Sequence, residues 1–244
     1  MLRHTGLKRS FKHNMRLAIM LCLNAGFINA AGFLAFSVLT TNVTGHAALL
    51  AVDVATKNFR STRMVALWLF LFLAGAFFSS FYISKVGRNK SFAYTIPIVF
   101  IIFILLFVAY FGHNYNNSLP ATEYFAGSLL FSMGIQNAMV SMISGSVVRT
   151  THLTGMFTDL GIDLSEAVHS FKNINPIVKR RIVLRVAIIG SFLFGGILGG
   201  LLFLRIKFAA FYIPPCFLLI ALFYDYFRIR VTRALNRKKN PFQK

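Results

Sequence analysis

Two short stretches hold most of the side chains whose types and spacing favour binding chemistry. They read "TTNVTGHAALLAVDVA" from residue 40 and "RTTHLTGMFTDLGIDL" from residue 149. Four of the chain's six acidic residues lie in or just after them: Asp53, Asp159, Asp163 and Glu166. An acid at membrane depth costs roughly 2.5–3.5 kcal/mol, so it usually has a partner or a function. With threonines and histidines beside them, these acids suit a polar or charged solute.

Both stretches contain the motif T-x-[VL]-T-G, at 41–45 and again at 151–155. An aspartate follows each motif glycine by eight residues, Asp53 in the first copy and Asp163 in the second. Three further pairs keep the same order along the chain: "GFINA" at 26–30 with "GIQNA" at 134–138, Gly75 with Gly195, and Pro97 with Pro214. Matched blocks in one order indicate an internal duplication, as in many transporters.

Each motif has the chemistry of a helix start. The threonine before each motif glycine can cap the first backbone N–H groups, and the glycine permits the turn. A helix start presents a partial positive charge and free N–H donors, which suit an anion. We predict short helices over 43–56 and 153–170. Two arrangements stay open: the helix starts converge inside the membrane, or both helices lie flat on its surface.

The predicted solute path takes residues from both copies. They are Asn29, Thr41, Asn42, Thr44, Gly45, His46, Asp53, Asn137, Thr151, His152, Thr154, Gly155, Asp159 and Asp163. Asn42 begins an Asn-Val-Thr sequon, but the second copy has His152 there, so we expect the motif and not glycosylation to place Asn42. Asp53 and Asp163 would act as charge or proton partners of the solute, or would fix the short helices.

The sequence leaves more than one possible partner for each of these acidic side chains. Asp159, Asp163 and Glu166 share one helix face, which either faces an aqueous cavity or pairs with arginines. The candidate arginines are Arg149, Arg181 and Arg185. Asp53 follows His46 by seven residues, so a His–Asp pair fits helix geometry. Amides in the apolar runs either link helices or line the solute path; they are Asn24, Asn29, Gln136 and Asn137.

Long apolar runs position these stretches. Hydrophobic residues make up 57% of the chain and charged residues 13%, against a soluble norm of roughly 25% charged. We predict an all-α polytopic membrane protein with six transmembrane helices, at 17–39, 64–86, 94–111, 123–148, 182–204 and 208–227. Halves of three crossings enter the membrane in opposite orientations. We therefore expect a 3+3 inverted repeat within a single membrane domain, 1–244, with repeat 1 at about 15–112 and repeat 2 at about 123–228.

The basic residues predict the orientation. With the N-terminus inside and six crossings, 21 of the 26 lysines and arginines lie inside. This asymmetry favours both termini inside, with 229–244 as a basic cytoplasmic tail. Counting the short helices as crossings gives eight spans, and it places Lys85, Arg88 and Lys90 outside, which fits the rule less well.

Several function classes are disfavoured. The net charge of +20 does not point to nucleic acid, because the basic residues cluster beside apolar runs. No HExxH or GxSxG motif occurs, and no histidine, cysteine or carboxylate set has metal-ligand spacing. We therefore expect no catalytic residue, no metal and no cofactor.

The sequence "GFINAAGFLAF…TTNVTGH", with "GIQNAMV…VVRTTHLTGMFTDLGIDL", resembles the YoaK-like family of bacterial integral membrane proteins of unknown function. The likeness covers almost the whole chain and is most specific at 149–161. It implies a membrane protein of six spans without an established activity. It also implies an aspartate where this chain has Asn29, so this chain lacks an ionised group there.

We expect a transporter or channel of the bacterial inner membrane for a small polar or anionic solute. The alternative is a non-transporting scaffold, and an intramembrane enzyme is a third class. A transporter predicts a polar cavity that reaches the motif threonines, a scaffold predicts no cavity there, and an enzyme needs His46 or His152 beside a carboxylate. Besides the lipid bilayer and the solute, we consider a second copy of the chain as partner, through small-residue faces: Gly75 with Ser79, or Gly195 with Gly199.

Overall fold

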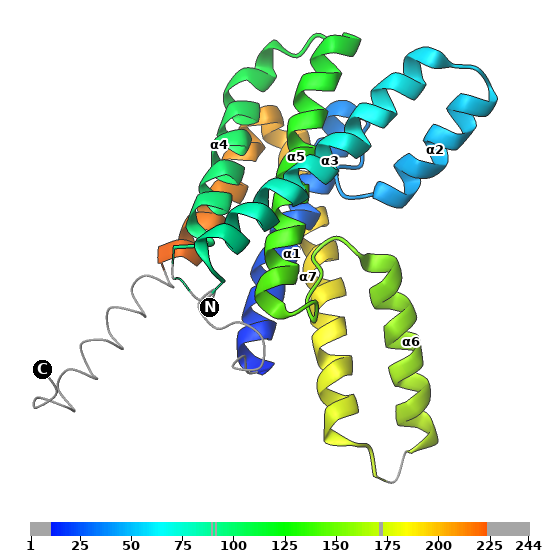
Figure 1. The fold of residues 1–244 in the computed structure, drawn as a ribbon, viewed down its shortest axis with the longest axis vertical. Helices are drawn as coiled ribbons and strands as arrows, with labels where there is room; N and C mark the ends of the chain where they lie inside the picture. The colour runs from blue at the N-terminus through cyan, green and yellow to red at the C-terminus, as the bar shows by residue number, and fades with distance from the viewer. Residues whose placement is uncertain (1–10, 89, 91, 171–172, 224–244) are drawn as a thin grey trace, which may run out of the picture.

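The computed structural model describes residues 11–88, 90, 92–170 and 173–223, and this part of the chain contains helices and no strand. Its helices run in chain order as α1 (Phe11–Phe36), α2 (Val43–Ala55), α3 (Phe59–Val86), α4 (Thr95–Phe111), the 3-10 helix η2 (Gly112–Asn114), α5 (Leu119–Ser144), α6 (Leu153–His169), α7 (Pro176–Ile206) and the 3-10 helix η3 (Lys207–Tyr212) (Figure 1). Residues 213–223 are helical again. The all-helical prediction is confirmed for these residues.

Five segments of the described chain are long and apolar enough to cross a membrane: Met15–Phe36, Phe59–Val86, Thr95–Asn114, Leu119–Ser144 and Pro176–Phe223. The last is a single segment of 48 residues that contains η3, where the chain turns and packs on α4 (Figure 1). The sixth predicted span, 208–227, begins inside η3, and its final residues lie outside the described part. The helical content and these apolar lengths are those of a membrane protein.

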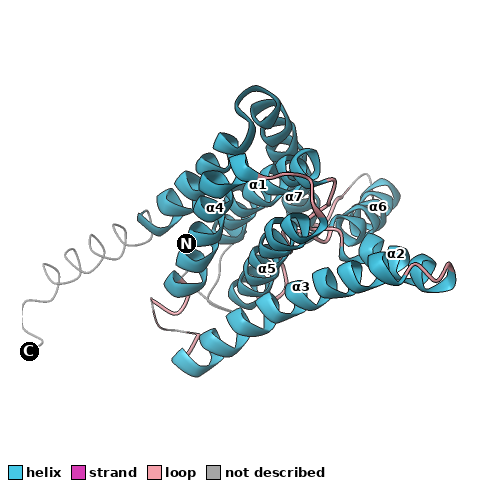
Figure 2. Ribbon diagram, turned by 90° about the horizontal axis from the view of Figure 1, so that it is seen from above, coloured by secondary structure: helices cyan, strands magenta, loops and turns pink. Residues whose placement is uncertain are grey.

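The short helices occur where the duplicated motif predicts them. The helix predicted at 43–56 is α2, and the one predicted at 153–170 is α6. In both views α2 and α6 lie on the same side of the molecule, α2 beside one end of α3 (Figures 1 and 2). In Figure 1 the two helices point away from each other, so that their starts are the nearer ends.

Helices α1 and α7 cross in close contact at glycines. A Cβ on Gly26 of α1 would overlap the carbonyl oxygen of Phe192 in α7, and a Cβ on Gly195 of α7 would overlap the carbonyl oxygen of Leu23 in α1. Only a residue without a side chain allows two backbones to approach this closely. The two glycines therefore set the distance between these helices.

Helices α3 and α5 cross in the same way. A Cβ on Gly75 of α3 would overlap the carbonyl oxygen of Phe131, and a Cβ on Gly134 of α5 would overlap that of Phe72. Ser79, one turn beyond Gly75, is completely buried. The small-residue faces considered above for a second copy of the chain are thus covered by helices of the same chain.

A buried amide pair joins α1 to α5. The Nδ2 of Asn24 donates to the Oε1 of Gln136 over 2.7 Å, and the Nε2 of Gln136 donates to the carbonyl of Leu21 over 2.9 Å. Both side chains are completely buried. The prediction that amides link helices is confirmed for these two residues.

Candidate functional site

A cavity of about 470 Å³ lies between the starts of α2 and α6. The first motif contributes Thr41, Asn42, Val43 and Thr44 to its lining, and the second contributes Thr151, His152, Leu153 and Thr154. The remaining described residues that line it are Phe72, Asn137, Ser141, Ser146 and Arg149. The two copies of the motif lie 110 residues apart in sequence, and their four threonines line one polar cavity.

The first copy of the motif begins α2 at Val43, as predicted, but with a different capping residue. Asn42 is the N-cap, and its Oδ1 accepts from the backbone N–H of Gly45 over 3.0 Å. The prediction that Thr44 caps the helix is wrong, because Thr44 is already the second helical residue. Gly45 does not serve a turn. A Cβ there would overlap the Asn42 amide, so the glycine makes room for the cap.

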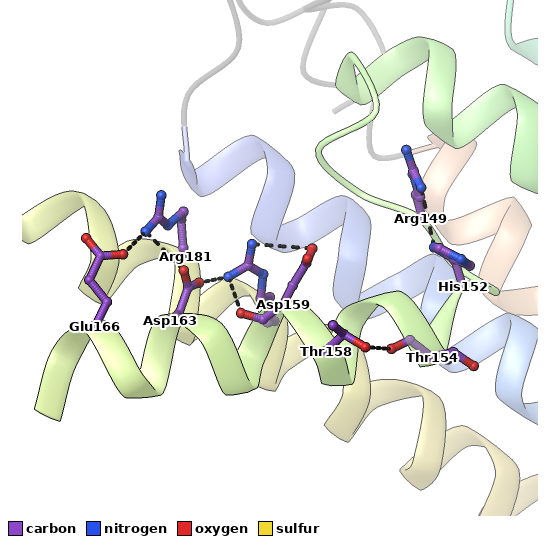
Figure 3. Close-up of polar contacts among 9 residues, drawn as sticks. Arg149, His152, Thr154, Thr158, Asp159, Asp163, Glu166 and Arg181 are labelled. Carbon is purple, nitrogen blue, oxygen red and sulfur yellow. Dashed lines mark hydrogen bonds and ion pairs between the residues drawn. The ribbon is translucent and has the colours of Figure 1, made fainter.

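The second copy keeps this geometry but loses the cap. His152 occupies the N-cap position of α6, and its side chain accepts no backbone N–H. Its Nδ1 lies 3.3 Å from the Nη1 of Arg149 instead (Figure 3). A Cβ on Gly155 would overlap the imidazole, so this glycine makes room for the histidine. As in α2, the motif threonine, Thr154, follows the helix start and is not its cap.

The amides matched between the two copies have different roles. Asn29 of α1 accepts from the backbone N–H of Thr41 over 3.1 Å, which fixes the loop before α2. Asn137, its counterpart in α5, lines the cavity, and its buried Oδ1 has no hydrogen-bond partner among the described residues. The Asn137 amide is therefore not engaged by these residues, whereas Asn29 is.

Sequence reasoning missed six residues that line the cavity: Val43, Phe72, Ser141, Ser146, Arg149 and Leu153. Ser141 had a usable signal, since it follows Asn137 by four residues and so lies on the same face of α5. The sequence suggests Arg149 only as a partner for the acids of α6. The contribution of Phe72 depends on how α3 crosses α5, for which the sequence carries no local signal.

The acids of α6 pair with arginines of α7 and do not line the cavity (Figure 3). Asp163, only 2% exposed, contacts Arg181 over 3.0 Å and forms a second ion pair with Arg185. Asp159 lies 3.4 Å from Arg185, and Glu166 lies 2.6 Å from Arg181. Of the alternatives left open by the sequence, the arginine-paired face is the one found. These ion pairs attach α6 to α7.

Asp53 and His46 do not form the pair that their spacing allows. The Oγ of Ser61 in α3 donates to the Oδ2 of Asp53 over 2.6 Å. The Nε2 of His46 lies 2.8 Å from the carbonyl oxygen of Leu39, and its ring packs against Trp68. Because both side chains have other partners, each stabilises the setting of α2, and neither lines the cavity.

A second cavity, of about 570 Å³, lies between α3, α4 and α5. Its walls are mainly leucine, isoleucine and phenylalanine, with Glu123 at one side. Glu123 lies 3.5 Å from Arg63, which is 78% exposed. Because few polar groups converge there, the smaller cavity at the motifs is the stronger candidate for a polar solute.

Comparison with known proteins gives a family and no characterised relative. No curated protein and no solved structure matches the chain. A family model matches residues 17–224, which include both motifs and nearly all the described helices. The match supports the expected family of unknown function but does not carry the YoaK-like name. The chain belongs to the family described as "Protein of unknown function (DUF1275)".

Proposed function

We propose that this protein is a transporter or channel for a small polar or anionic solute, which binds between the two T-x-[VL]-T-G motifs. The observation that carries the proposal is the shared cavity: Thr41, Thr44, Thr151 and Thr154 line one polar space. No hydrogen bond joins the hydroxyl of Thr44 or Thr154 to another described residue, so both are available to a solute. Polar groups that converge on a cavity are the usual mark of a solute site.

We further propose that the chain crosses the inner membrane of a bacterium six times, as a 3+3 inverted repeat with both termini inside. The glycine crossings support this arrangement. Gly26 matches Gly134 in sequence, and Gly195 matches Gly75. Each glycine therefore makes the same contact as its sequence match. The contact of Gly26 with α7 corresponds to that of Gly134 with α3, and the contact of Gly195 with α1 corresponds to that of Gly75 with α5. An inverted repeat requires this correspondence.

The same geometry favours helix starts that converge inside the membrane over helices that lie on its surface. Phe72 and Asn137, beside the starts of α2 and α6, each lie three residues from the glycines where α3 and α5 cross. Those glycines are near the middle of the apolar segments Phe59–Val86 and Leu119–Ser144. Two half-helices that begin near the midplane would direct their N–H groups at a solute there.

The alternatives fit the same contacts less well. A scaffold in which the motif only locks helices together needs packed threonines, and these threonines border open space. An intramembrane enzyme needs a histidine beside a carboxylate. His46 bonds to the carbonyl of Leu39, and His152 lies beside Arg149. The scaffold is therefore the outcome against which transport is tested.

The test uses purified protein reconstituted into lipid vesicles, with solute entry followed by light scattering for glycerol, urea, potassium acetate and potassium phosphate. We expect entry of at least one solute above that into empty vesicles. The double variant Thr44→Val/Thr154→Val should reduce this rate about thirtyfold, because two lost hydrogen bonds of about 1 kcal/mol each sum to about 2 kcal/mol. Valine keeps the shape of threonine, so the helices should still form.

Thr158→Val is the matched control, because this exposed threonine of α6 donates to the backbone of Thr154 and does not line the cavity. It should leave the rate unchanged. Wild-type vesicles that behave like empty ones for every solute would favour the scaffold. Equal rates in the wild type and the double variant would remove the assigned site.

A further inference from the structure

We infer that the solute of this cavity is a small oxyanion, carrying a carboxylate or phosphate group, and that Arg149 holds it at the α6 side of the cavity. The inference rests on the proposed function, because it takes the cavity as the solute site. It goes beyond that function in choosing oxyanions among the polar and anionic solutes, and in naming the residue that selects them.

The formal charge of the cavity supports an anion. Among the described residues that line it, Arg149 is the only one with a formal charge at neutral pH. The nearest carboxylates along α6 are engaged elsewhere, since Asp159 and Asp163 pair with Arg185. A cation would find no carboxylate in the lining, whereas an anion finds a guanidinium. The guanidinium presents parallel N–H donors that match the two oxygens of a carboxylate or phosphate.

The difference between the two motifs places the anion near α6. In α2 the side chain of Asn42 occupies the N–H of Gly45. In α6 the residue at that position, His152, accepts no N–H through its side chain, so the N–H groups of Leu153, Thr154 and Gly155 have no partner among the described residues. The cap lost from the second copy thus leaves backbone donors beside Arg149, at the helix end that favours negative charge.

Uncommitted side chains complete the set. Asn137 lines the cavity, and its amide makes no hydrogen bond to another described residue, so its NH2 group can donate to a bound anion. The hydroxyl of Thr154 makes no hydrogen bond to another described residue and lies on the same helix start. An oxyanion accepts several hydrogen bonds at once, so it can use the guanidinium, the amide, the hydroxyl and the free N–H groups together.

The test measures thermal unfolding of the full chain in detergent, in sodium phosphate, sodium acetate or sodium chloride at one ionic strength, and in glycerol or short-chain phosphatidylglycerol. A ligand that binds the folded state raises its stability. We expect phosphate or acetate to raise the Tm by roughly 2–4 °C above its value in chloride. The rise should disappear in Arg149→Gln and shrink in Arg149→Lys, which keeps the charge but loses the paired donors.

Arg205→Gln is the control for removal of one positive charge, because Arg205 is exposed at the far end of α7 and has no ion pair among the described residues. It should keep the full rise. Equal Tm values in phosphate, acetate and chloride would overturn the inference, as would a rise that survives in Arg149→Gln. A rise produced only by short-chain phosphatidylglycerol would also overturn it, because the cavity would then hold a lipid headgroup.

The two proposals fail in different ways. Threonine-dependent entry of glycerol or urea into vesicles, with no response to phosphate or acetate in detergent, would leave transport standing and remove the oxyanion. An Arg149-dependent rise in Tm without solute entry into any vesicle would leave the oxyanion site standing and remove transport.

Discussion

The α2–α3 and α6–α7 helix pairs share a motif but differ in how an aspartate attaches the short helix to the long one. In the second pair, Asp163 is buried between Arg181 and Arg185, and its attachment is ionic. In the first pair, Asp53 accepts a single hydrogen bond from Ser61. One aspartate position thus performs one structural task with two different chemistries.

The partners occupy matched positions as well. Ser61 precedes Gly75 by 14 residues, and Arg181 precedes Gly195 by the same number. The aspartate therefore contacts a matched position of the long helix in each pair, and Asp163 has a second contact with Arg185. Since a guanidinium is stabilised by water, the 43% exposure of Arg181 fits a helix pair that reaches the aqueous phase. The spacing of the motif thus predicts an attachment point and not a solute contact.

The glycine crossings give the largest expected effect and the strictest test of whether the two halves are equivalent. We predict that Gly26→Ala and Gly134→Ala each destabilise the protein by about 3 kcal/mol, because the added methyl group overlaps a backbone carbonyl of the neighbouring helix. Thermal unfolding in detergent measures the effect. Gly190→Ala is the control, since a Cβ there meets nothing within 4 Å.

Equivalence requires the two variants to lose similar stability. A large loss in Gly26→Ala together with none in Gly134→Ala would mean that the α3–α5 crossing is looser than the α1–α7 crossing. The two halves would then match in sequence but differ in how tightly their helices pack. Gly190→Ala should be neutral or slightly stabilising, because alanine favours a helix more than glycine does.

The aspartate variants have the next largest expected effect on stability. We predict that Asp163→Asn destabilises the protein by about 2 kcal/mol, because it leaves two arginines around a buried neutral group. Asp53→Asn should cost less than about 1 kcal/mol, since an amide oxygen can still accept from Ser61. Thermal unfolding of both variants gives the difference.

Solute entry into vesicles then separates attachment from transport chemistry. If the aspartates only fix the short helices, Asp53→Asn should keep nearly the wild-type rate. A complete loss of entry in folded Asp53→Asn, at unchanged stability, would instead make this carboxylate a charge or proton partner of the solute. The assignment of Asp53 to attachment would then be wrong.

The positions of the short helices were predictable because their signals are local. A motif repeated with its aspartate eight residues after the glycine indicates one unit used twice, and the apolar residues that follow indicate a helix. The helix predicted at 43–56 ends at Ala55, one residue early. The threonines, identified by the same repeat, all line the cavity.

The roles of single residues were less predictable, because each depends on a partner in another helix. Ser61 and Arg181 approach the aspartates only through the way α3 and α7 are rotated, and the apolar pattern of a membrane helix leaves that rotation open. The N-cap of α2 is Asn42, two residues before the predicted Thr44. Helix ends carry this uncertainty generally, so their chemistry follows from geometry more than from spacing.

The caps provide the smallest expected effect and bear most directly on function. Asn42→Ala should cost about 1 kcal/mol, the usual contribution of an N-cap side chain. His152→Asn should do the opposite and stabilise α6 by about 0.5–1 kcal/mol, since it restores the cap that the second copy lacks.

The same change, His152→Asn, should weaken the response to phosphate or acetate, because the new side chain occupies a backbone N–H assigned to the oxyanion. Stability without ligand and the anion-dependent rise in Tm must therefore move in opposite directions in His152→Asn. If both rise together, the free N–H groups of α6 are not the ligands of the anion, and the difference between the two motifs has no part in solute binding.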